Sequence, residues 1–303
     1  MVEGMESVTA KLCSFARAYH SNREKKKIFD DYLAFDIMGW EEYEKVGQLI
    51  EHEYVWDRYD PAYAFKRDDI KETLDKYIAP IPLSRAAFAE KELKRFAGKN
   101  KVCQYVILGA GLDTFAFRND NPNIKIYELD HPDTQKYKLE KIRALEWNIP
   151  ENVNYVPVDF ATEDMREKLF KAGFDKETPT FFAFLGVTYY LTLPVFEETI
   201  ERIKDMACVG SRLVFDFPDE STLNGNAAER VRTLSEITAF LGEPRKHGYS
   251  VLEIGDALLR QGFKTVVHET PDDIQEEFFK GRSDGKRAYE NIHFIVAKKT
   301  AAS

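Results

Sequence analysis

This sequence contains few cysteines and has no excess of positive charge. Only three of its 303 residues are cysteines, and they lie far apart, at Cys13, Cys103 and Cys208. So few and so scattered thiols exclude a disulfide framework and a zinc site and fit a reducing compartment, and we expect no bound metal. The net charge of −9 argues against a protein that binds nucleic acid through its phosphates.

Long hydrophobic runs are also missing. No stretch reaches the roughly 18–20 apolar residues that cross a membrane, and the opening MVEGMESVTA lacks the apolar centre of a signal peptide. We therefore expect a cytoplasmic protein without membrane contact. A hydrophobic content of 44% with 31% charged residues is typical of globular proteins and excludes a disordered or fibrous chain.

The first hundred residues show no strand alternation, and residues 1–100 are predicted to form a helical appendage. Apolar side chains recur at three- and four-residue spacing in Lys11–Tyr19, Asp36–Glu51 and Asp69–Tyr77. Pro80 and Pro82 then interrupt the pattern. We expect the next helix to be capped by Ser84 and to stop at Gly98.

After Gly98, short apolar runs alternate with amphipathic helices, which is typical of a parallel α/β sheet. Seven strands are predicted: Tyr105–Leu108, Lys125–Leu129, Asn154–Val158, Thr180–Leu185, Arg212–Phe217, Phe263–Val267 and Ile292–Ala297. The mostly charged link before the last run indicates an antiparallel edge strand. Residues 101–303 are expected to form the α/β core, with a lid-like insertion at 218–249 because that connection is unusually long.

Three of the helices between strands have a capping residue in front and a glycine behind. They are expected over Thr162–Gly173, Thr192–Gly210 and Ser250–Gly262. The third also carries Glu253 three residues after Ser250, the spacing of a capping box.

The sharpest local signal follows the first strand, in the run Tyr105-Val-Ile-Leu-Gly109-Ala110-Gly111-Leu-Asp113-Thr114. A strand that runs into Gly-Ala-Gly leaves the backbone bare, so that a ligand can come close. A structural loop explains the same glycines, so the motif alone is weak.

The second strand supports a ligand site because it ends on an acid, in Ile126-Tyr-Glu128-Leu-Asp130. A carboxylate at this tip can accept hydrogen bonds from both ribose hydroxyls of a bound nucleoside. The alternative is that Asp130 only caps the helix that begins near Pro132. With both motifs in order, we favour adenosine binding.

The turn also indicates which adenosine ligand binds. A nicotinamide fingerprint needs a third glycine where this chain has Thr114. The acid Asp113 is a poor neighbour for two phosphates and a good one for an ammonium group. S-adenosyl-L-methionine has no phosphate and carries an α-amino group, so the turn favours it over NAD.

The ends of two further predicted strands carry side chains that could contact the cofactor. Asp159 can accept from the adenine amine with Phe160 beside the ring, although a helix-entry loop explains the same letters. Tyr189 and Tyr190 follow the fourth strand, where open sheets bind ligands, and their faces suit a sulfonium; a buried strand end explains them equally well. The histidines are isolated from one another, and no catalytic residue is identified.

With these residues in place, the chain resembles the leucine carboxyl methyltransferase-like family, which includes many bacterial S-adenosylmethionine-dependent methyltransferases. The matching motifs are Val106-Ile-Leu-Gly-Ala-Gly-Leu-Asp-Thr, Tyr127-Glu-Leu-Asp-His-Pro and Val158-Asp-Phe. Arg85, 24 residues before Gly109 (109 − 85), matches an upstream arginine of the family. The resemblance covers most of the chain and is densest from Arg85 to Leu191.

The resemblance implies a Rossmann-like, seven-stranded class I methyltransferase sheet with its last strand antiparallel. It also implies roles at the matching positions. Arg85 would pair with the methionine carboxylate, and Gly109 to Gly111 would let the backbone pass the methionine. Asp130, with Glu128, would hold the ribose, and Asp159 with Phe160 the adenine.

One departure from the family pattern matters for function. Leu185 stands where many relatives carry glutamate. This departure removes a carboxylate from the methionine end of the site. We expect O-methylation of a carboxylate or hydroxyl on a small molecule. A protein carboxylate acceptor, a non-catalytic S-adenosylmethionine-binding protein and an NAD-dependent oxidoreductase are the alternatives.

Overall fold

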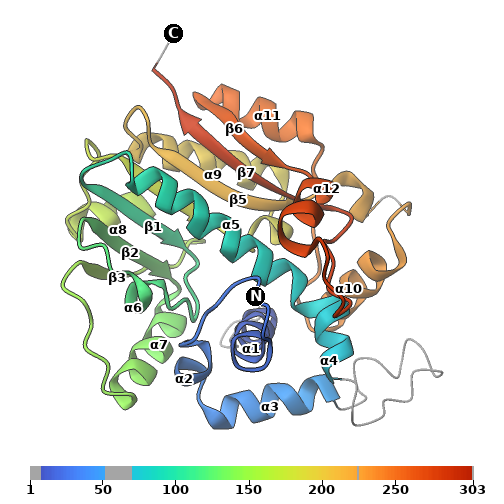
Figure 1. Ribbon diagram of the computed structural model, residues 1–303. Coiled ribbons are helices and arrows are strands. Elements are labelled where there is room, and N and C mark those ends of the chain that lie inside the picture. The colour runs from blue at the N-terminus through green and yellow to red at the C-terminus, as the bar shows by residue number, and fades with distance from the viewer. Residues whose placement is uncertain (1–7, 52–69, 224, 302–303) are drawn as a thin grey trace.

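The computed structural model describes residues 8–51, 70–223 and 225–301. A seven-stranded sheet lies at its centre, in the order β3-β2-β1-β4-β5-β7-β6 (Figure 1). All seven predicted strands are confirmed, and their bounds are β1 Cys103–Leu108, β2 Ile124–Asp130, β3 Val153–Pro157, β4 Thr180–Phe184, β5 Arg212–Pro218, β6 Phe263–Glu269 and β7 Ile292–Lys299.

The helices of the described residues follow the predicted alternation with strands. They are α1 Val8–Arg23, α2 Ala34–Met38, α3 Trp40–Glu51, α4 Ile70–Thr73, α5 Pro80–Ala97, α6 Phe115–Arg118, α7 Pro132–Ala144, α8 Met165–Lys171, α9 Leu193–Met206, α10 Glu229–Phe240, α11 Val251–Arg260 and α12 Pro271–Ile274. Shorter 3₁₀ or π-helical pieces are η1 Leu74–Ile78, η2 Thr188–Tyr190, η3 Glu220–Thr222 and η4 Gln275–Phe279.

The topology confirms the predicted Rossmann-like α/β class. Strands β1 to β5 pair in parallel, and β7 is antiparallel to both β5 and β6. The last strand is therefore antiparallel as predicted, but it lies inside the sheet and β6 forms the edge. The strand order reverses between β1 and β4, and open α/β sheets bind ligands at the carboxyl ends of strands beside such a reversal.

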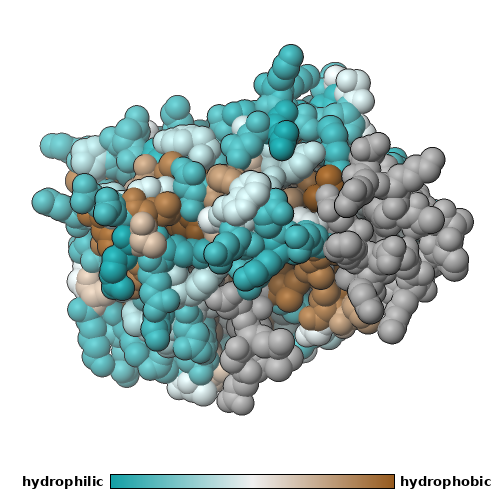
Figure 2. Space-filling view, turned by 90° about the horizontal axis from the view of Figure 1, so that it is seen from below, coloured by the Kyte–Doolittle hydropathy of each residue, from teal (hydrophilic) through white to brown (hydrophobic). Residues whose placement is uncertain are grey.

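The N-terminal helices lie beyond one end of the sheet. In Figure 1, α1, α2 and α3 gather below the ends of β1 and β2. Seen from that side, the surface is largely hydrophilic, with apolar residues gathered in patches (Figure 2). No helix in the described part of the chain is long and apolar enough to cross a membrane.

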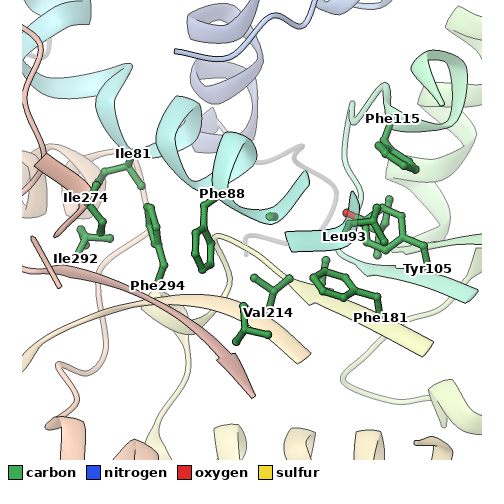
Figure 3. Packing of buried hydrophobic residues seen from close by; sticks show 14 of the residues in the cluster. Ile81, Phe88, Leu93, Tyr105, Phe115, Phe181, Val214, Ile274, Ile292 and Phe294 are labelled. Carbon is green, nitrogen blue, oxygen red and sulfur yellow. The ribbon is translucent and has the colours of Figure 1, made fainter. Parts of the chain in front are cut away.

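Apolar layers cover both faces of the sheet. On one face α5 crosses the strands, with Phe88 against Phe294 of β7 at a ring-centroid distance of 5.2 Å (Figure 3). The other face packs against α8, α9 and α11 through Leu169, Ile200 and Leu258. Helix α5 thus packs on the sheet although it falls within residues 1–100. The boundary at residue 100 and the insertion at 218–249 stay predictions.

The predicted start of α5 is wrong. The helix begins at Pro80, because a proline fits the first turn, where its missing N–H would have no partner in any case. Ser84 lies inside the helix, and its hydroxyl donates to the carbonyl of Pro80 at 2.7 Å. The predicted stop at Gly98 is confirmed.

Other helix ends differ from the sequence pattern in detail. Helix α8 is capped by Asp164 instead of Thr162, and α9 ends at Met206, before Gly210. The stretch expected as one helix over Asp36–Glu51 is split into α2 and α3 at Gly39. The capping box of α11 is confirmed. In the stretch predicted from Asp69, that first residue lies outside the described residues.

One buried histidine makes the stability of the N-terminal region depend on pH. His20 is 1% exposed, and its Nε2 accepts from the N–H of Ile28 at 2.8 Å. Burial, with Lys286 and Arg282 nearby, lowers the pKa of His20 from 6.5 to about 4. The folded state therefore keeps His20 neutral at a pH where the unfolded state protonates it.

We predict that the free energy of unfolding falls as the pH drops below 6.5. Between pH 6.5 and 5.0 this group accounts for a loss of about 2 kcal/mol. The variant His20→Gln keeps an acceptor for Ile28 and cannot titrate, so urea unfolding should show a shallower pH dependence by that amount. Equal slopes in the variant and the wild type would contradict the prediction.

Candidate functional site

The glycine turn lies at the carboxyl end of β1. Gly109 and Gly111 have φ angles of +78° and +50°, which residues with a side chain rarely adopt. The N–H groups of Gly109 and Ala110 donate to the carbonyl of Leu129, which fixes the turn against β2. Apart from its chain neighbours, no described residue has an atom within 4 Å of a Cβ built on Gly111. The turn therefore leaves open space beside bare backbone.

Asp130, at the end of β2, lies against this turn. Its Oδ2 accepts from the N–H of Gly111 at 2.5 Å, and its Oδ1 accepts from the N–H of His131 at 2.7 Å. Burial raises the pKa of Asp130, and the two backbone N–H groups oppose that rise. The alternative role as a helix cap is wrong, because His131 caps α7.

Glu128 lies two residues before Asp130 on the same face of β2. It is 1% exposed and forms an ion pair with Lys138 of α7. Burial raises the pKa of Glu128 to about 7 even though Lys138 lowers it. Lys138 also donates to the carbonyl of Asp113, so the Glu128–Lys138 ion pair helps to hold the glycine turn in place. A contact between Glu128 and ribose stays a prediction.

Asp113 itself has a local role in the turn. Its Oδ1 accepts from the N–H of Phe115 at 2.6 Å, the first residue of α6. A carboxylate at this place occupies the helix N-terminus where a nucleotide phosphate would bind. The described geometry therefore agrees with a ligand that has no phosphate.

Arg85, on α5, is held by an acid that the sequence analysis missed. Its Nη1 lies 3.3 Å from Oδ2 of Asp216, a fully buried residue in β5. Asp216 also accepts from the N–H of Gly186 at 2.7 Å and from the hydroxyl of Tyr189 at 2.6 Å. Burial alone would lower the pKa of Arg85, but Asp216, with smaller contributions from Cys13 and Tyr189, raises it overall. The guanidinium is a fixed positive charge.

Gly186 allows this guanidinium to lie against the end of β4. Its φ is +72°, and an added Cβ would lie 2.6 Å from the Nη1 of Arg85. Any side chain here would therefore push Arg85 away. Leu185, the residue before it, is half-buried and packs against the apolar layer under α5. Leu185 brings no carboxylate to the site where many relatives carry a glutamate.

A second buried acid ties the N-terminal segment to the glycine turn. Asp31 is fully buried and lies 3.3 Å from Arg17 of α1 and 3.4 Å from Arg118 of α6. It also accepts from the hydroxyl of Thr114. Arg17 reaches further and donates to the carbonyl of Leu112 at 3.0 Å. Helix α1 is thus bonded directly to the turn.

Asp159 and Phe160 lie on the connection after β3. Asp159 accepts from the N–H of Ala161 at 2.9 Å and the hydroxyl of Thr162 at 2.8 Å, so it orders its own loop. Phe160 is 37% exposed and can receive a flat ligand. Their predicted contact with adenine stays a prediction.

Tyr189 and Tyr190 form most of η2 after β4. Burial and Asp216 raise the pKa of Tyr189 well above its usual value, and burial followed by Glu243 raises the pKa of Tyr190 to about 12. Both hydroxyls are therefore protonated at neutral pH. They are not general bases, and their predicted contact with the acceptor stays a prediction.

The sequence did contain signals for the missed residues. Asp216 is a charged residue inside the apolar run of β5, and such a residue needs a buried partner. Asp31 is an acid in the short segment between the predicted helical stretches Lys11–Tyr19 and Asp36–Glu51. Neither signal names the partner, because Arg85 and Arg17 are distant in sequence.

Comparison with known proteins decides the family. The model of the family described as leucine carboxyl methyltransferase matches residues 10–204. This chain belongs to that family. A Bacillus subtilis protein, YktD, inferred to be an S-adenosyl-L-methionine-dependent methyltransferase, is 35% identical over 99% of this chain and 100% of its own length. A relative from Mycolicibacterium paratuberculosis, inferred to have the same activity, is 31% identical over 59% of this chain and 58% of its own.

Solved structures agree on the fold. A DUF574 family protein from Streptomyces avermitilis superposes with a TM-score of 0.56 at 13% identity, covering 96% of this chain and 97% of that one. A Thermobifida fusca protein inferred to be a methyltransferase gives a TM-score of 0.50 at 16% identity, covering 78% of this chain and 88% of its own. At such identities the likeness shows the class I methyltransferase fold alone.

The protein is therefore an S-adenosyl-L-methionine-dependent methyltransferase, and the residues present fit that cofactor. The open space beside Gly111 can receive its methionine part. Arg85 can supply a fixed cation for its carboxylate, and Asp130 can supply acceptors for its ribose hydroxyls. The predicted cofactor is confirmed, while the contact of each single residue stays a prediction.

We predict that Asp216→Asn weakens the binding of S-adenosylhomocysteine by about 10-fold. The asparagine keeps an acceptor for Gly186 but no longer balances the charge of Arg85, so the guanidinium is free to turn away. Calorimetric titration measures the effect. The control Asp175→Asn changes an exposed loop acid that holds Thr178, and should leave affinity unchanged. Unchanged affinity in Asp216→Asn would refute the positioning role.

Proposed function

We propose that this methyltransferase transfers its methyl group to a carboxylate or hydroxyl oxygen of a small molecule. The observation that carries the proposal is the wall formed by η2, α1 and the 218–249 segment beside Arg85. Cys13 of α1 lies 3.7 Å from Nη2 of Arg85, and Lys246 donates its N–H to the carbonyl of Tyr189 at 3.0 Å. An acceptor bound there would lie next to the methionine end of the cofactor.

The chemistry supports oxygen as the methylated atom. S-adenosyl-L-methionine supplies a methyl group on a positive sulfur, and an acceptor atom must approach it in line. A carboxylate oxygen is already anionic and needs no base, whereas a neutral hydroxyl usually needs one. The two tyrosines of η2 keep their protons at neutral pH. A site without a tyrosinate base suits a carboxylate best.

Positioning is the main contribution of the protein's own residues to such a reaction. Orientation of two reactants can lower a barrier by about 7–11 kcal/mol. Arg85 would fix the cofactor's carboxylate, Asp130 its ribose, and the aromatic wall of η2 would shape the space for the acceptor. Tyr189 contributes rigidity, because its hydroxyl is held by Asp216.

The alternatives have less support. An NAD-dependent oxidoreductase needs a helix N-terminus for a pyrophosphate, and here α6 has four residues with its first N–H taken by Asp113. A protein acceptor is the function for which the family is named. A non-catalytic protein is suggested only by Leu185.

The products of a methylation assay test the proposal. With labelled S-adenosyl-L-methionine and a pool of small carboxylic acids and phenols, we expect label in O-methyl products. Mild alkali distinguishes the two kinds, because it hydrolyses methyl esters to methanol and leaves aryl methyl ethers intact. Label on nitrogen or carbon would contradict O-methylation. Binding of the cofactor without turnover on any pool would favour the non-catalytic alternative.

A further inference from the structure

The 218–249 segment turns charged side chains toward the site. Glu243, Arg245 and His247 are half-buried, and the two residues between them are exposed. This alternation places every second side chain on one side of an extended segment. The N–H of Lys246 donates to the carbonyl of Tyr189 at 3.0 Å. The side that carries Glu243, Arg245 and His247, here called the inner strip, therefore lies over η2.

Two members of the inner strip lie on aromatic rings of the site. The guanidinium carbon of Arg245 is 5.2 Å from the ring centroid of Tyr189, and the ring of His247 meets Tyr249 edge-on at a centroid distance of 4.5 Å. Tyr249 in turn donates its hydroxyl to the carbonyls of Thr188 and Leu191. Both side chains thus face the end of β4.

One polar atom of Arg245 and one of His247 are buried without a partner among the described residues. Nη1 of Arg245 and Nε2 of His247 make no hydrogen bond within the part of the chain that the structure describes. Among those residues Arg245 also has no carboxylate within 4.0 Å. The acid of the strip, Glu243, lies instead 3.5 Å from the hydroxyl of Tyr190. Buried polar atoms are nearly always hydrogen-bonded in proteins, so an unpaired guanidinium N–H indicates a ligand.

We propose that Arg245, with His247 beside it, binds an anionic group of the methyl acceptor. The acceptor is then a small molecule that carries a carboxylate in addition to the oxygen that is methylated. This inference rests on the proposed function and names its substrate class. A guanidinium suits this task because its planar fork can donate two hydrogen bonds to one carboxylate.

The bound anion is distinct from the reacting oxygen for a physical reason. A carboxylate oxygen loses its negative charge as the methyl group arrives, so an arginine bonded to it would stabilise the substrate more than the transition state. A second anionic group keeps its charge throughout and can be held from start to end. Arg245 therefore orients the acceptor without lowering the reactivity of the methylated oxygen.

Atoms and electrons balance in the methyl transfer when Arg245 has this role. The acceptor oxygen forms a bond to the methyl carbon, the carbon–sulfur bond breaks, and its electron pair stays on sulfur as S-adenosylhomocysteine leaves. If the methylated group is a hydroxyl, its proton is released to water. The carboxylate on Arg245 is unchanged.

Binding of matched probes tests the inference. The wild-type protein, saturated with S-adenosylhomocysteine, is titrated with 4-hydroxybenzoate and glutarate and with their neutral amides, 4-hydroxybenzamide and glutaramide. We expect at least one acid to bind about 10-fold or more tightly than its amide. The dissociation constant of S-adenosylhomocysteine is measured first, because it reports the cofactor site independently.

Variants assign the effect to one side chain. Arg245→Met should weaken the binding of the acid by about 10-fold or more and leave S-adenosylhomocysteine binding unchanged. Arg245→Lys should bind the acid more tightly than Arg245→Met and less tightly than the wild type. Lys246→Met is the matched control, because it removes the same charge from the outer side of the same segment, and it should leave the acid's affinity unchanged.

Several results would overturn the inference. Equal binding of acids and amides, no binding of either acid, or unchanged acid binding in Arg245→Met would each do so while S-adenosylhomocysteine still binds. If Arg245→Met fails to fold, the inference is tested by the ratio of acid to amide affinity in the wild type and by the acid affinity of Arg245→Lys. Failure of the wild type to bind S-adenosylhomocysteine would instead contradict the proposed function, and the inference with it.

Discussion

A single buried carboxylate organises the site of this methyltransferase. Asp216 has no exposed surface, and three different elements give it partners: Arg85 from α5, the N–H of Gly186 after β4 and the hydroxyl of Tyr189 in η2. Breaking a buried ion pair by removing one partner typically costs about 3–5 kcal/mol. The positions of the cation, the strand end and the aromatic wall are therefore coupled through one side chain.

The N-terminal helices are part of the same site. Asp31 lies between Arg17 and Arg118, and Arg17 also donates to the carbonyl of Leu112 in the glycine turn. Because Arg17 is mostly buried, moving α1 away would separate its charge from Asp31 and from the carbonyl of Leu112. Order in the appendage and order in the turn should therefore be linked.

The sequence predicted the sheet better than the contacts. Short apolar runs located all seven strands, and the glycine motif with Asp130 located the carboxyl edge of the sheet. The errors were local. Ser84 has the chemistry of a cap, but the prolines before it suit the first turn and extended the helix. Arg85–Asp216 joins residues 131 positions apart, and no spacing rule reaches that far. The tertiary fold alone pairs such residues.

The same limit applies to the internal partners of the acids that the sequence singled out. Asp113 was expected beside an ammonium group and Glu128 beside the ribose, and in the structure Asp113 accepts from the N–H of Phe115 and Glu128 accepts from Lys138. Burial and partners decide whether an acid faces the ligand. Asp130 also accepts from two backbone N–H groups, but it lies at the strand end beside the open space of Gly111.

The central claim is that Arg85, fixed by Asp216, binds the carboxylate of the cofactor. The most direct measurement compares the affinity of S-adenosylhomocysteine with that of its decarboxylated analogue, in the wild type and in Arg85→Met. The account predicts that the wild type prefers S-adenosylhomocysteine by about 10-fold or more and that the variant loses this preference by binding the intact ligand less tightly. A variant that retained the full preference would show that another group holds the carboxylate, and the account would be wrong.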